Sequence, residues 1–478
     1  MTKIRLRYAP SPTGFLHIGN TRTALMNYLY AHHYNGDFIV RIEDTDIERN
    51  VEGAIESQFD NMEWLGISPD ESFLKPIDKY GKYMQSQKFD RYKELAEKLI
   101  EKGFAYKCFC TPQELQIERE EQEARGIVAT KYSKKCLYRN DIDQLKDKPY
   151  NIRFNVGEDQ AIKINDVVRG DVEFNSKEIG DFVILKSNGI ATYNFAVVVD
   201  DYDMQITHVV RGEEHISNTP KQCLIYSAFN WTEPKFCHLT LIVDETKKKL
   251  SKRSGNAMFF ISQYREQGYL PEALFNYIAL LGWSPKGEQE IFSKEEFVKM
   301  FDEKRFSKSP STFDMVKMKW INSQWMKKLS DENYLEFTKK FIDKSKFNID
   351  NKEPLWLNSV LMLFKKELEF GSQINKHLDI FFNDVEVSAQ TKETLGTLSD
   401  YKEMILSLKN ELINLEDFEE NNIKKIISML GKTFEKKGKD LFMPIRIFTT
   451  LSEHGPELAK TISLLGKQKV LKNIDSLL

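Results

Sequence analysis

The fold of this chain is decided by one stretch near its start, Arg5-Leu-Arg-Tyr-Ala-Pro-Ser-Pro-Thr-Gly-Phe-Leu-His-Ile-Gly-Asn20. Alternating apolar and charged residues at 4–8 predict a strand. Pro10 and Pro12 end it, because each lacks a backbone N–H and restricts the residue before it. A helix-spaced apolar run at 18–34 and a second apolar run at 38–42 follow. Together they predict a strand–helix–strand unit of the size that a parallel crossover requires.

A histidine and a glycine occupy the place in this unit where ligands usually bind. In parallel units, ligands lie beyond the carboxyl ends of the strands, next to a helix N-terminus. His17 and Gly19 fall there. A histidine at a helix start is, by itself, more often a plain cap, so a functional assignment depends on further motifs.

Size and composition narrow the class of protein. The 478 residues suffice for roughly three domains, and the net charge of −3 provides no global field that would attract nucleic acid. An RNA partner would need local basic patches. The odd number of cysteines, 5, does not indicate a disulfide framework. Because the chain also shows neither an apolar signal core nor a membrane-spanning run, we expect a soluble, cytoplasmic protein, with monomer as the default.

The pattern changes character along the chain. Short alternating segments between 137 and 190 predict antiparallel strands in an inserted module. The apolar run at 193–201 ends in two acids and predicts a buried parallel strand, and 206–211 predicts another. From about residue 246 the periodicity is helical, with an apolar stripe at 423–430 that Gly431 is expected to close.

Three motifs now support a resemblance to a known family. His17-Ile-Gly19-Asn20 resembles the HIGH signature of class I aminoacyl-tRNA synthetases, and Arg41-Ile-Glu-Asp-Thr-Asp46 resembles the glutamyl branch. Lys249-Leu-Ser-Lys-Arg253 is similar to the KMSKS loop of the same class. The later matches at 193–201, 211–215, 268–284 and 320–322 extend the resemblance across nearly the whole chain.

The resemblance implies an α/β fold with a split, Rossmann-like parallel-sheet catalytic domain, an α+β insertion and an all-α C-terminal anticodon-binding region. We expect the catalytic domain at 1–105 and 191–245 and the inserted acceptor-binding domain at 106–190. A helical stem-contact domain with the lysine loop would occupy 246–325, and the anticodon-binding domain would occupy 326–478. The lysines at 436, 437 and 439 could contact RNA phosphates, although a solvated helix end explains any single one equally well.

The implied reaction joins L-glutamate to the 3′ end of tRNA(Glu) through a glutamyl-adenylate, with ATP and Mg²⁺. Mobile lysines can neutralise the charge that accumulates on departing diphosphate. The resemblance assigns catalysis to His17, Gly19, Lys249 and Lys252, and adds Asn20 and Ser251 as ATP-binding residues.

The predicted glutamate pocket follows from two arginines at the ends of different strands. Arg7 and Arg211 can face one crevice, and planar guanidinium groups match carboxylates. The resemblance implies that Glu43 holds the α-amino group. It lines the pocket with six residues, namely Arg7, Ala9, Ser11, Glu43, Tyr193 and Arg211. The alternative is that Arg7 and Glu43 form a cross-strand ion pair without a ligand.

Three cysteines and a tyrosine form a candidate zinc site. Cys108 and Cys110 are followed by Tyr132 and Cys136, and some glutamyl enzymes bind zinc with a similar pattern. In part, those enzymes use a histidine where this chain has Tyr138, and a tyrosine ligand is atypical. The sequence therefore leaves two interpretations of these cysteines open, a structural zinc site, which is favoured, and three ordinary free thiols.

Several other functions compete with glutamate–tRNA ligation. A glutaminyl enzyme is disfavoured because the C-terminal half lacks repeated short strands, and a truncated paralogue because some 150 residues follow the catalytic region. A non-catalytic tRNA-binding protein would have been favoured by loss of His17 or Lys252, which are both present. A small-molecule nucleotidyltransferase would not need the helical half. Charging of tRNA(Gln) as well stays open.

Overall fold

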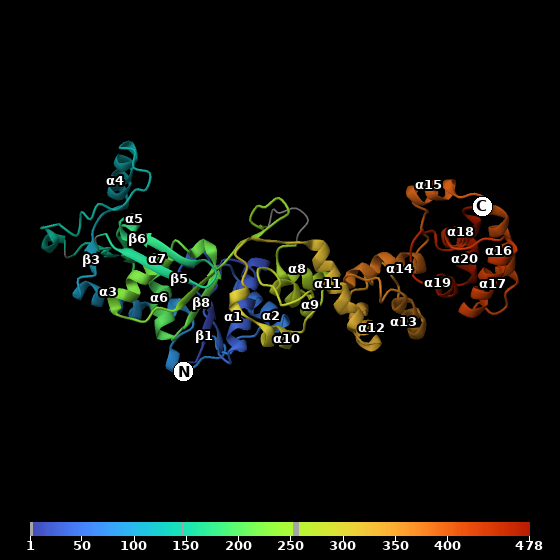
Figure 1. The fold of residues 1–478 in the computed structure, drawn as a ribbon, viewed down its shortest axis with the longest axis horizontal. Coiled ribbons are helices and arrows are strands. Elements are labelled where there is room, and N and C mark those ends of the chain that lie inside the picture. The colour runs from blue at the N-terminus through green and yellow to red at the C-terminus, as the bar shows by residue number, and fades with distance from the viewer. Residues whose placement is uncertain (1–2, 146, 158, 252–257) are drawn as a thin grey trace. The chain divides into compact units, whose positions relative to one another are not determined.

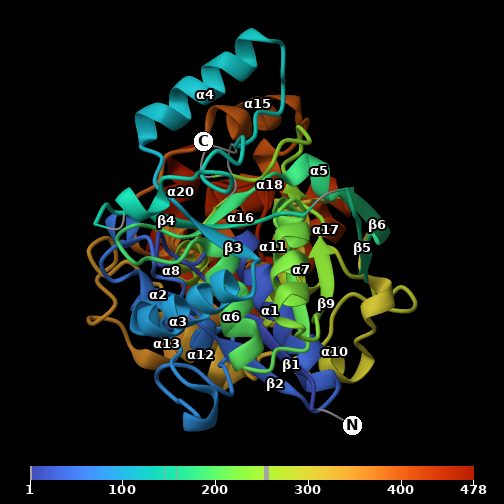
Figure 2. The same cartoon turned by 90° about the vertical axis from the view of Figure 1, so that its left-hand side faces the viewer.

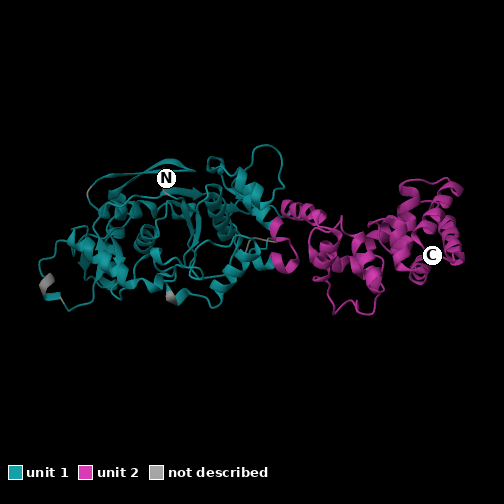
Figure 3. Cartoon of the chain, turned by 90° about the horizontal axis from the view of Figure 1, so that it is seen from below, with its two compact units in different colours: residues 1–263, 274–315 teal, residues 264–273, 316–478 magenta. Residues whose placement is uncertain are grey.

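The computed structural model describes residues 3–145, 147–157, 159–251 and 258–478 (Figure 1). They form two compact units (Figure 3). The first contains residues 1–263 and 274–315, and the second contains residues 264–273 and 316–478. Within the described ranges, every helix is too short or too polar to cross a bilayer.

The centre of the first unit is a six-stranded sheet. Its strands, in spatial order, are β2 (Asp37–Val40), β1 (Arg5–Tyr8), β8 (His208–Gly212), β9 (Lys235–Leu239), β5 (Ala161–Asp166) and β6 (Gly170–Asn175). Neighbours from β2 to β5 are parallel, and β6 pairs antiparallel with β5. Helix α1 (Ile18–His33) connects β1 to β2, and α7 (Thr219–Phe229) connects β8 to β9. The predicted split, parallel-sheet α/β fold is confirmed.

The opening stretch folds as its residue pattern predicts. Leu6 and Tyr8 are buried in β1, and α1 starts directly after His17. The turn that leads to β2 needs a residue without a side chain, because a Cβ on Gly36 would lie 2.3 Å from the carbonyl oxygen of Ile4. The close approach of this turn to β1 fixes the start of β2 beside it.

The segment between the two halves of the sheet contains the predicted antiparallel strands. β3 (Ala105–Cys108), β4 (Asn151–Phe154) and β7 (Phe182–Leu185) form a separate three-stranded sheet. The β5–β6 hairpin instead extends the main sheet, so this segment is not a wholly separate module. Helices α3 (Phe89–Glu101) and α5 (Ser176–Ile179) pack against these strands, and α4 (Pro112–Ala124) follows β3. Helix α2 (Ala54–Trp64) comes earlier in the chain, after β2, and its Gln58 bonds the carbonyl oxygen of Gly14. Figure 2 shows α4 projecting from the sheets, which agrees with its lack of buried residues.

The prediction of a parallel strand at 193–201 is wrong. This segment is helix α6 (Tyr193–Asp203), and its apolar residues are buried on several faces. A short helix surrounded by other elements is apolar all round, and periodicity alone cannot distinguish it from a buried strand. The two terminal acids, Asp200 and Asp201, are buried and ion-paired, so they do not cap a strand.

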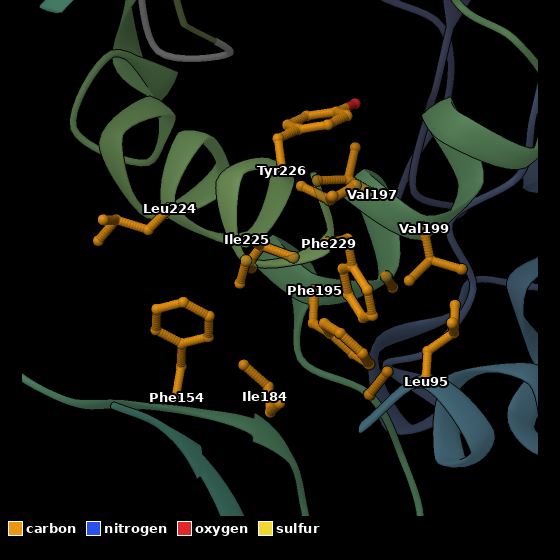
Figure 4. Close-up of a cluster of buried hydrophobic side chains, with 14 of the residues drawn as sticks. Leu95, Phe154, Ile184, Phe195, Val197, Val199, Leu224, Ile225, Tyr226 and Phe229 are labelled. Atoms are coloured by element: carbon orange, nitrogen blue, oxygen red, sulfur yellow. The ribbon is translucent and has the colours of Figure 1, made fainter. Parts of the chain in front are cut away.

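The hydrophobic core explains why this run is helical. Phe195, Val197 and Val199 of α6 pack with α7, and Figure 4 shows the cluster reaching Leu95 of α3, Phe154 of β4 and Ile184 of β7. Burying α6 on all these sides links the small sheet to the helices beside the main sheet. The core thereby fixes where α6 presents its first and last residues.

The remainder of the first unit contains two short strands and a helix, namely β10 (Ile242–Val243), β11 (Ser311–Thr312) and α10 (Lys294–Met300). Helices α8 (Ile261–Gln267) and α9 (Pro271–Ala279) are divided between the units. As predicted, α9 begins at Pro271, although it ends three residues before Gly282.

The second unit is helical in its described residues. Its helices are α11 (Met315–Lys328), α12 (Asp331–Lys339), α13 (Pro354–Leu363), α14 (Ile374–Phe382), α15 (Ala389–Thr397), α16 (Lys402–Asn414), α17 (Glu420–Thr433), α18 (Lys439–Thr450), α19 (Leu458–Leu465) and α20 (Lys467–Asp475). The apolar stripe of α17 is buried, as predicted. Gly431 does not close α17 but lies inside it, where a Cβ would come within 2.9 Å of a methyl group of Leu441.

Candidate functional site

His17 occupies the N-terminus of α1 in an extended conformation. Its Nδ1 accepts a hydrogen bond of 3.3 Å from the backbone N–H of Asn20. The imidazole stacks on Phe259, with 4.6 Å between the ring centres. Since Nδ1 accepts, the neutral ring carries its proton on Nε2 and can donate from there to an anion. A helix N-terminus with such a donor suits phosphate oxygens.

A cavity of about 710 Å³ lies in front of this helix end. It is lined by all the predicted ATP-binding residues that the structure describes, namely His17, Gly19, Asn20, Lys249 and Ser251. The absence of a side chain at Gly19 makes room for the His17 ring, since a Cβ there would lie 3.2 Å from it. Lys252, the other predicted catalytic lysine, lies outside the described residues.

A second cavity, of about 380 Å³, adjoins the first. It is lined by the six residues predicted for glutamate, namely Arg7, Ala9, Ser11, Glu43, Tyr193 and Arg211. Both cavities share lining residues, among them Ser11, Asn20 and Gly212. A group bound in the second cavity can therefore meet a phosphate in the first.

Arg7 and Glu43 each have a different buried partner. Arg7 Nε lies 3.1 Å from Asp201 Oδ1, whereas Glu43 Oε1 accepts a 3.0 Å hydrogen bond from Arg41. Arg41 also donates to Asp201 at 2.7 Å. Among the described ion pairs, the structure thus shows no direct pair of Arg7 with Glu43, which was the alternative without a ligand.

Burial and charge act in opposite directions on these acids. Burial raises the pKa of Glu43, although Arg41 and Arg7 oppose the shift. Burial also acts to raise the pKa of Asp201, but the charges of Arg7 and Arg41 outweigh it and keep that pKa below its ordinary value. Asp201 therefore stays ionised and holds Arg7 at the pocket wall.

Arg211 is held on the other wall by uncharged groups. Its Nη2 donates to Thr219 Oγ1 and to Gln222 Oε1, both at 2.8 Å, and its Nη1 donates to the Tyr193 hydroxyl at 3.4 Å. The side chain is buried, and burial lowers its pKa from the ordinary value. The pocket thus has a cation on each of two adjacent strands and an acid, Glu43, for an ammonium group.

Sequence reasoning missed several residues of this site. His215 bonds the Tyr193 hydroxyl through Nδ1 at 3.1 Å, and burial lowers its pKa to about 4, so it is neutral. Asn218 also lines the glutamate cavity. Arg41 and Asp201 are bonded to each other and to the pocket residues Glu43 and Arg7, respectively. The motif at 211–215 contained the signal for His215, whereas the ion pairs of Asp201 depend on α6 being a helix.

The three predicted cysteines lie together. The sulfur atoms of Cys108, Cys110 and Cys136 are buried and within 4.8 Å of one another. The Tyr132 hydroxyl lies 3.3 Å from Cys110 Sγ and 3.6 Å from Cys108 Sγ. Tyr138 is 72% exposed and does not belong to the cluster.

Comparisons with known proteins agree with this geometry. Residues 3–320 match the family model "tRNA synthetases class I (E and Q), catalytic domain", and residues 326–478 match "Anticodon binding domain". A glutamate–tRNA ligase of Mycoplasma capricolum is 66% identical, with 99% of each chain covered. One of Lysinibacillus sphaericus is 50% identical, again with 99% coverage of both.

A solved structure has the same overall fold. The glutamate–tRNA ligase of Elizabethkingia meningosepticum, crystallised in complex with its amino acid, superimposes with a TM-score of 0.88 at 34% identity and covers 99% of both chains. The fold, the two matched family models and the full-length relatives point to one conclusion. The chain belongs to the glutamate–tRNA ligases, a family of class I tRNA synthetases.

Proposed function

We propose that this protein ligates L-glutamate to the 3′ end of tRNA(Glu), using ATP and passing through a glutamyl-adenylate. One observation carries the proposal: two contiguous cavities, of which one offers arginines and an acid for an amino acid, and the other a helix N-terminus with a lysine for phosphates. The full-length relatives named glutamate–tRNA ligase support the same reaction.

The first step joins the amino acid to AMP. An oxygen of the α-carboxylate attacks the α-phosphorus of ATP, and the bond to the diphosphate breaks, so that diphosphate leaves with the electron pair. The α1 N-terminus, His17 Nε2 and the lysine loop stabilise the charge on the phosphates. Mg²⁺ accompanies ATP and offsets further charge.

Arg7, Arg211 and Tyr193 are placed to hold carboxylate, and Glu43 to hold the ammonium group. In the second step, the terminal ribose hydroxyl of tRNA attacks the carbonyl carbon, and AMP leaves as the C–O bond to its phosphate breaks. Catalysis comes from positioning and charge stabilisation, without a covalent enzyme intermediate.

The second unit supports the proposed binding of tRNA. A cavity of about 660 Å³ lies between α17, α18 and the start of α19. Four cationic side chains line it, namely Lys424, Lys432, Lys436 and Arg446. Cations beside apolar side chains such as Phe442 suit phosphates and exposed bases. We assign anticodon binding to 326–478, acceptor binding to 106–190, stem contact to 246–325 and catalysis to 1–105 and 191–245.

The cysteine cluster fits a structural zinc ion. Cys108, Cys110, Cys136 and Tyr132 would hold it, since three buried sulfurs and a phenol oxygen already lie within reach of one point. The ion would tie β3 to the loop after α4 and has no part in the reaction. Zinc content of the purified protein, measured by atomic emission, tests this assignment. We also infer a cytoplasmic monomer.

The proposed function is tested by charging radiolabelled glutamate onto purified tRNA(Glu) and tRNA(Gln), beside a Lys252→Ala control. We expect charging of tRNA(Glu) that the control abolishes. Charging of both tRNAs would identify a non-discriminating enzyme whose second product needs an amidotransferase. Charging of neither would contradict the catalytic proposal and favour a non-catalytic tRNA-binding protein.

A further inference from the structure

The two arginines of the glutamate cavity differ in how their charges are balanced. Arg7 contacts the carboxylate of Asp201. Arg211, which is 5% exposed, has only uncharged hydrogen-bond partners among the described residues: His238, Thr219, Gln222 and Tyr193. An almost buried cation without a bonded anion is costly unless a ligand supplies one.

The orientation of Arg211 depends on a histidine in the neighbouring strand. β8 and β9 pair with Arg211 directly opposite His238, and Arg211 Nε lies 3.2 Å from His238 Nε2. A guanidinium group can only donate, so Nε2 must be the unprotonated, accepting nitrogen of the ring. The Thr219 hydroxyl, 3.0 Å away, bonds the same nitrogen.

The next strand selects this form of the ring. His238 Nδ1 lies 2.6 Å from Asp166 Oδ2, at the end of β5, and both side chains are fully buried. A carboxylate accepts, so Nδ1 must carry the proton. In the opposite tautomer, Nε2 would carry the proton and would place a second donor against the N–H donor of Arg211. Asp166 is itself held by the backbone N–H groups of Val168 and Arg169, each at 2.9 Å, and of His238 at 3.1 Å.

We propose that Asp166 and His238 are positioning residues for glutamate, which hold Arg211 in place without neutralising it. A carboxylate bonded directly to Arg211 would fix the side chain equally well but would cancel the charge that the ligand must meet. The neutral imidazole of His238 supplies the acceptor for Arg211. Asp166 bonds the far nitrogen of that ring and does not contact Arg211 directly. The inference rests on the proposed glutamate site and adds two residues that the motifs did not indicate.

The dyad also has a consequence for the segment between the sheet halves. Asp166 belongs to the β5–β6 hairpin, which lies within 106–190, the range proposed to bind the tRNA acceptor end. The same strand that extends the main sheet therefore sets the direction of a side chain in the glutamate cavity.

The test compares variants that keep only part of the hydrogen-bonded chain from Asp166 through His238 to Arg211. His238→Gln can still accept from Arg211 with its amide oxygen in place of Nε2, whereas His238→Asn keeps a donor toward Asp166 and loses that acceptor. Asp166→Asn keeps an oxygen for the backbone N–H groups but donates toward Nδ1, and so reverses the tautomer. Steady-state charging gives KM for glutamate, ATP and tRNA, and thermal unfolding gives the folded fraction.

We expect Asp166→Asn and His238→Asn to raise KM for glutamate by about tenfold or more, because each removes a hydrogen bond to a charged group. KM for ATP and tRNA should stay within about twofold, and His238→Gln should raise KM for glutamate less than His238→Asn does. Equal changes in all three KM values, an unchanged glutamate KM, or failure of all these variants to fold would show a structural pair and overturn the proposal.

Arg211→Ala separates this inference from the proposed site. If this variant leaves KM for glutamate unchanged, the assignment of Arg211 to glutamate is wrong, and the inference falls with it. If Arg211→Ala raises KM for glutamate while the dyad variants do not, the site stands and only the positioning role is contradicted.

Discussion

Asp201 lies between two guanidinium groups, 3.1 Å from Arg7 Nε and 2.7 Å from Arg41 Nη1. Asp201→Asn keeps the size of the side chain but removes the charge, which leaves two buried cations under-compensated. We expect a loss of about 3 kcal/mol in the free energy of unfolding, measured in urea, and a higher KM for glutamate because Arg7 is no longer held.

The matched control is Asp203→Asn in the same helix. Asp203 pairs with Arg91 and Lys88, but its side chain is 19% exposed and does not line the glutamate cavity. We expect a loss of about 1 kcal/mol or less and an unchanged KM. Equal effects of the two substitutions would contradict the role given to Asp201.

His208 makes the stability depend on pH. It is 7% exposed, and burial together with the charge of Lys235 lowers its pKa to about 4, against about 6.5 in an unfolded chain. Between these pH values the unfolded chain binds a proton at His208 that the folded protein does not bind. The contribution of His208 to the free energy of unfolding is therefore fully present above pH 6.5 and is lost as the pH decreases toward 4. His208→Gln should reduce that fall by at most about 3 kcal/mol, measured by urea unfolding from pH 7.5 to 4.5. An identical pH dependence in the variant would refute the assignment.

At the scale of the element, α17 and α18 approach each other at a glycine. A Cβ on Gly431 would lie 2.9 Å from Leu441 Cδ2 and 3.1 Å from the Lys436 carbonyl oxygen. We expect Gly431→Ala to destabilise the protein by about 1–3 kcal/mol through overpacking, measured by urea unfolding. Gly396→Ala is the control in α15, where nothing lies within 4 Å, and it should be neutral or stabilising by about 0.5–1 kcal/mol. A stabilising Gly431→Ala would show that the helices can separate without cost.

Elements also show where sequence periodicity was sufficient. The buried stripe of α17 follows from a local rule, because a 3.6-residue period is a property of neighbouring residues. The α6 segment shows the limit, since an apolar run of this length is compatible with a strand or a buried helix. Only the packing of α3, α7 and the small sheet around this segment decides that it is a helix.

For the whole molecule, the net charge of −3 means that tRNA must be attracted by local cations. Lys432 is exposed at the cavity between α17 and α18. We expect Lys432→Glu to raise KM for tRNA several-fold at physiological salt and to weaken its salt dependence, while KM for glutamate and ATP is unchanged. An exposed lysine outside the cavity, Lys344, provides the charge-matched control Lys344→Glu. Equal effects of both substitutions would indicate non-specific attraction only.

The sequence by itself determined the parallel α/β unit, the place of His17 at a helix start and the family resemblance, because these depend on residues close together in the chain. It also indicated Arg7 and Arg211 as partners in one crevice, since carboxyl ends of parallel strands share an edge. The helical form of α6, the pairing of Arg7 with Asp201 and the relay from Asp166 through His238 to Arg211 were decided only by tertiary structure. Each brings together side chains from distant segments, and a buried charge acquires its partner only when packing has excluded water from both.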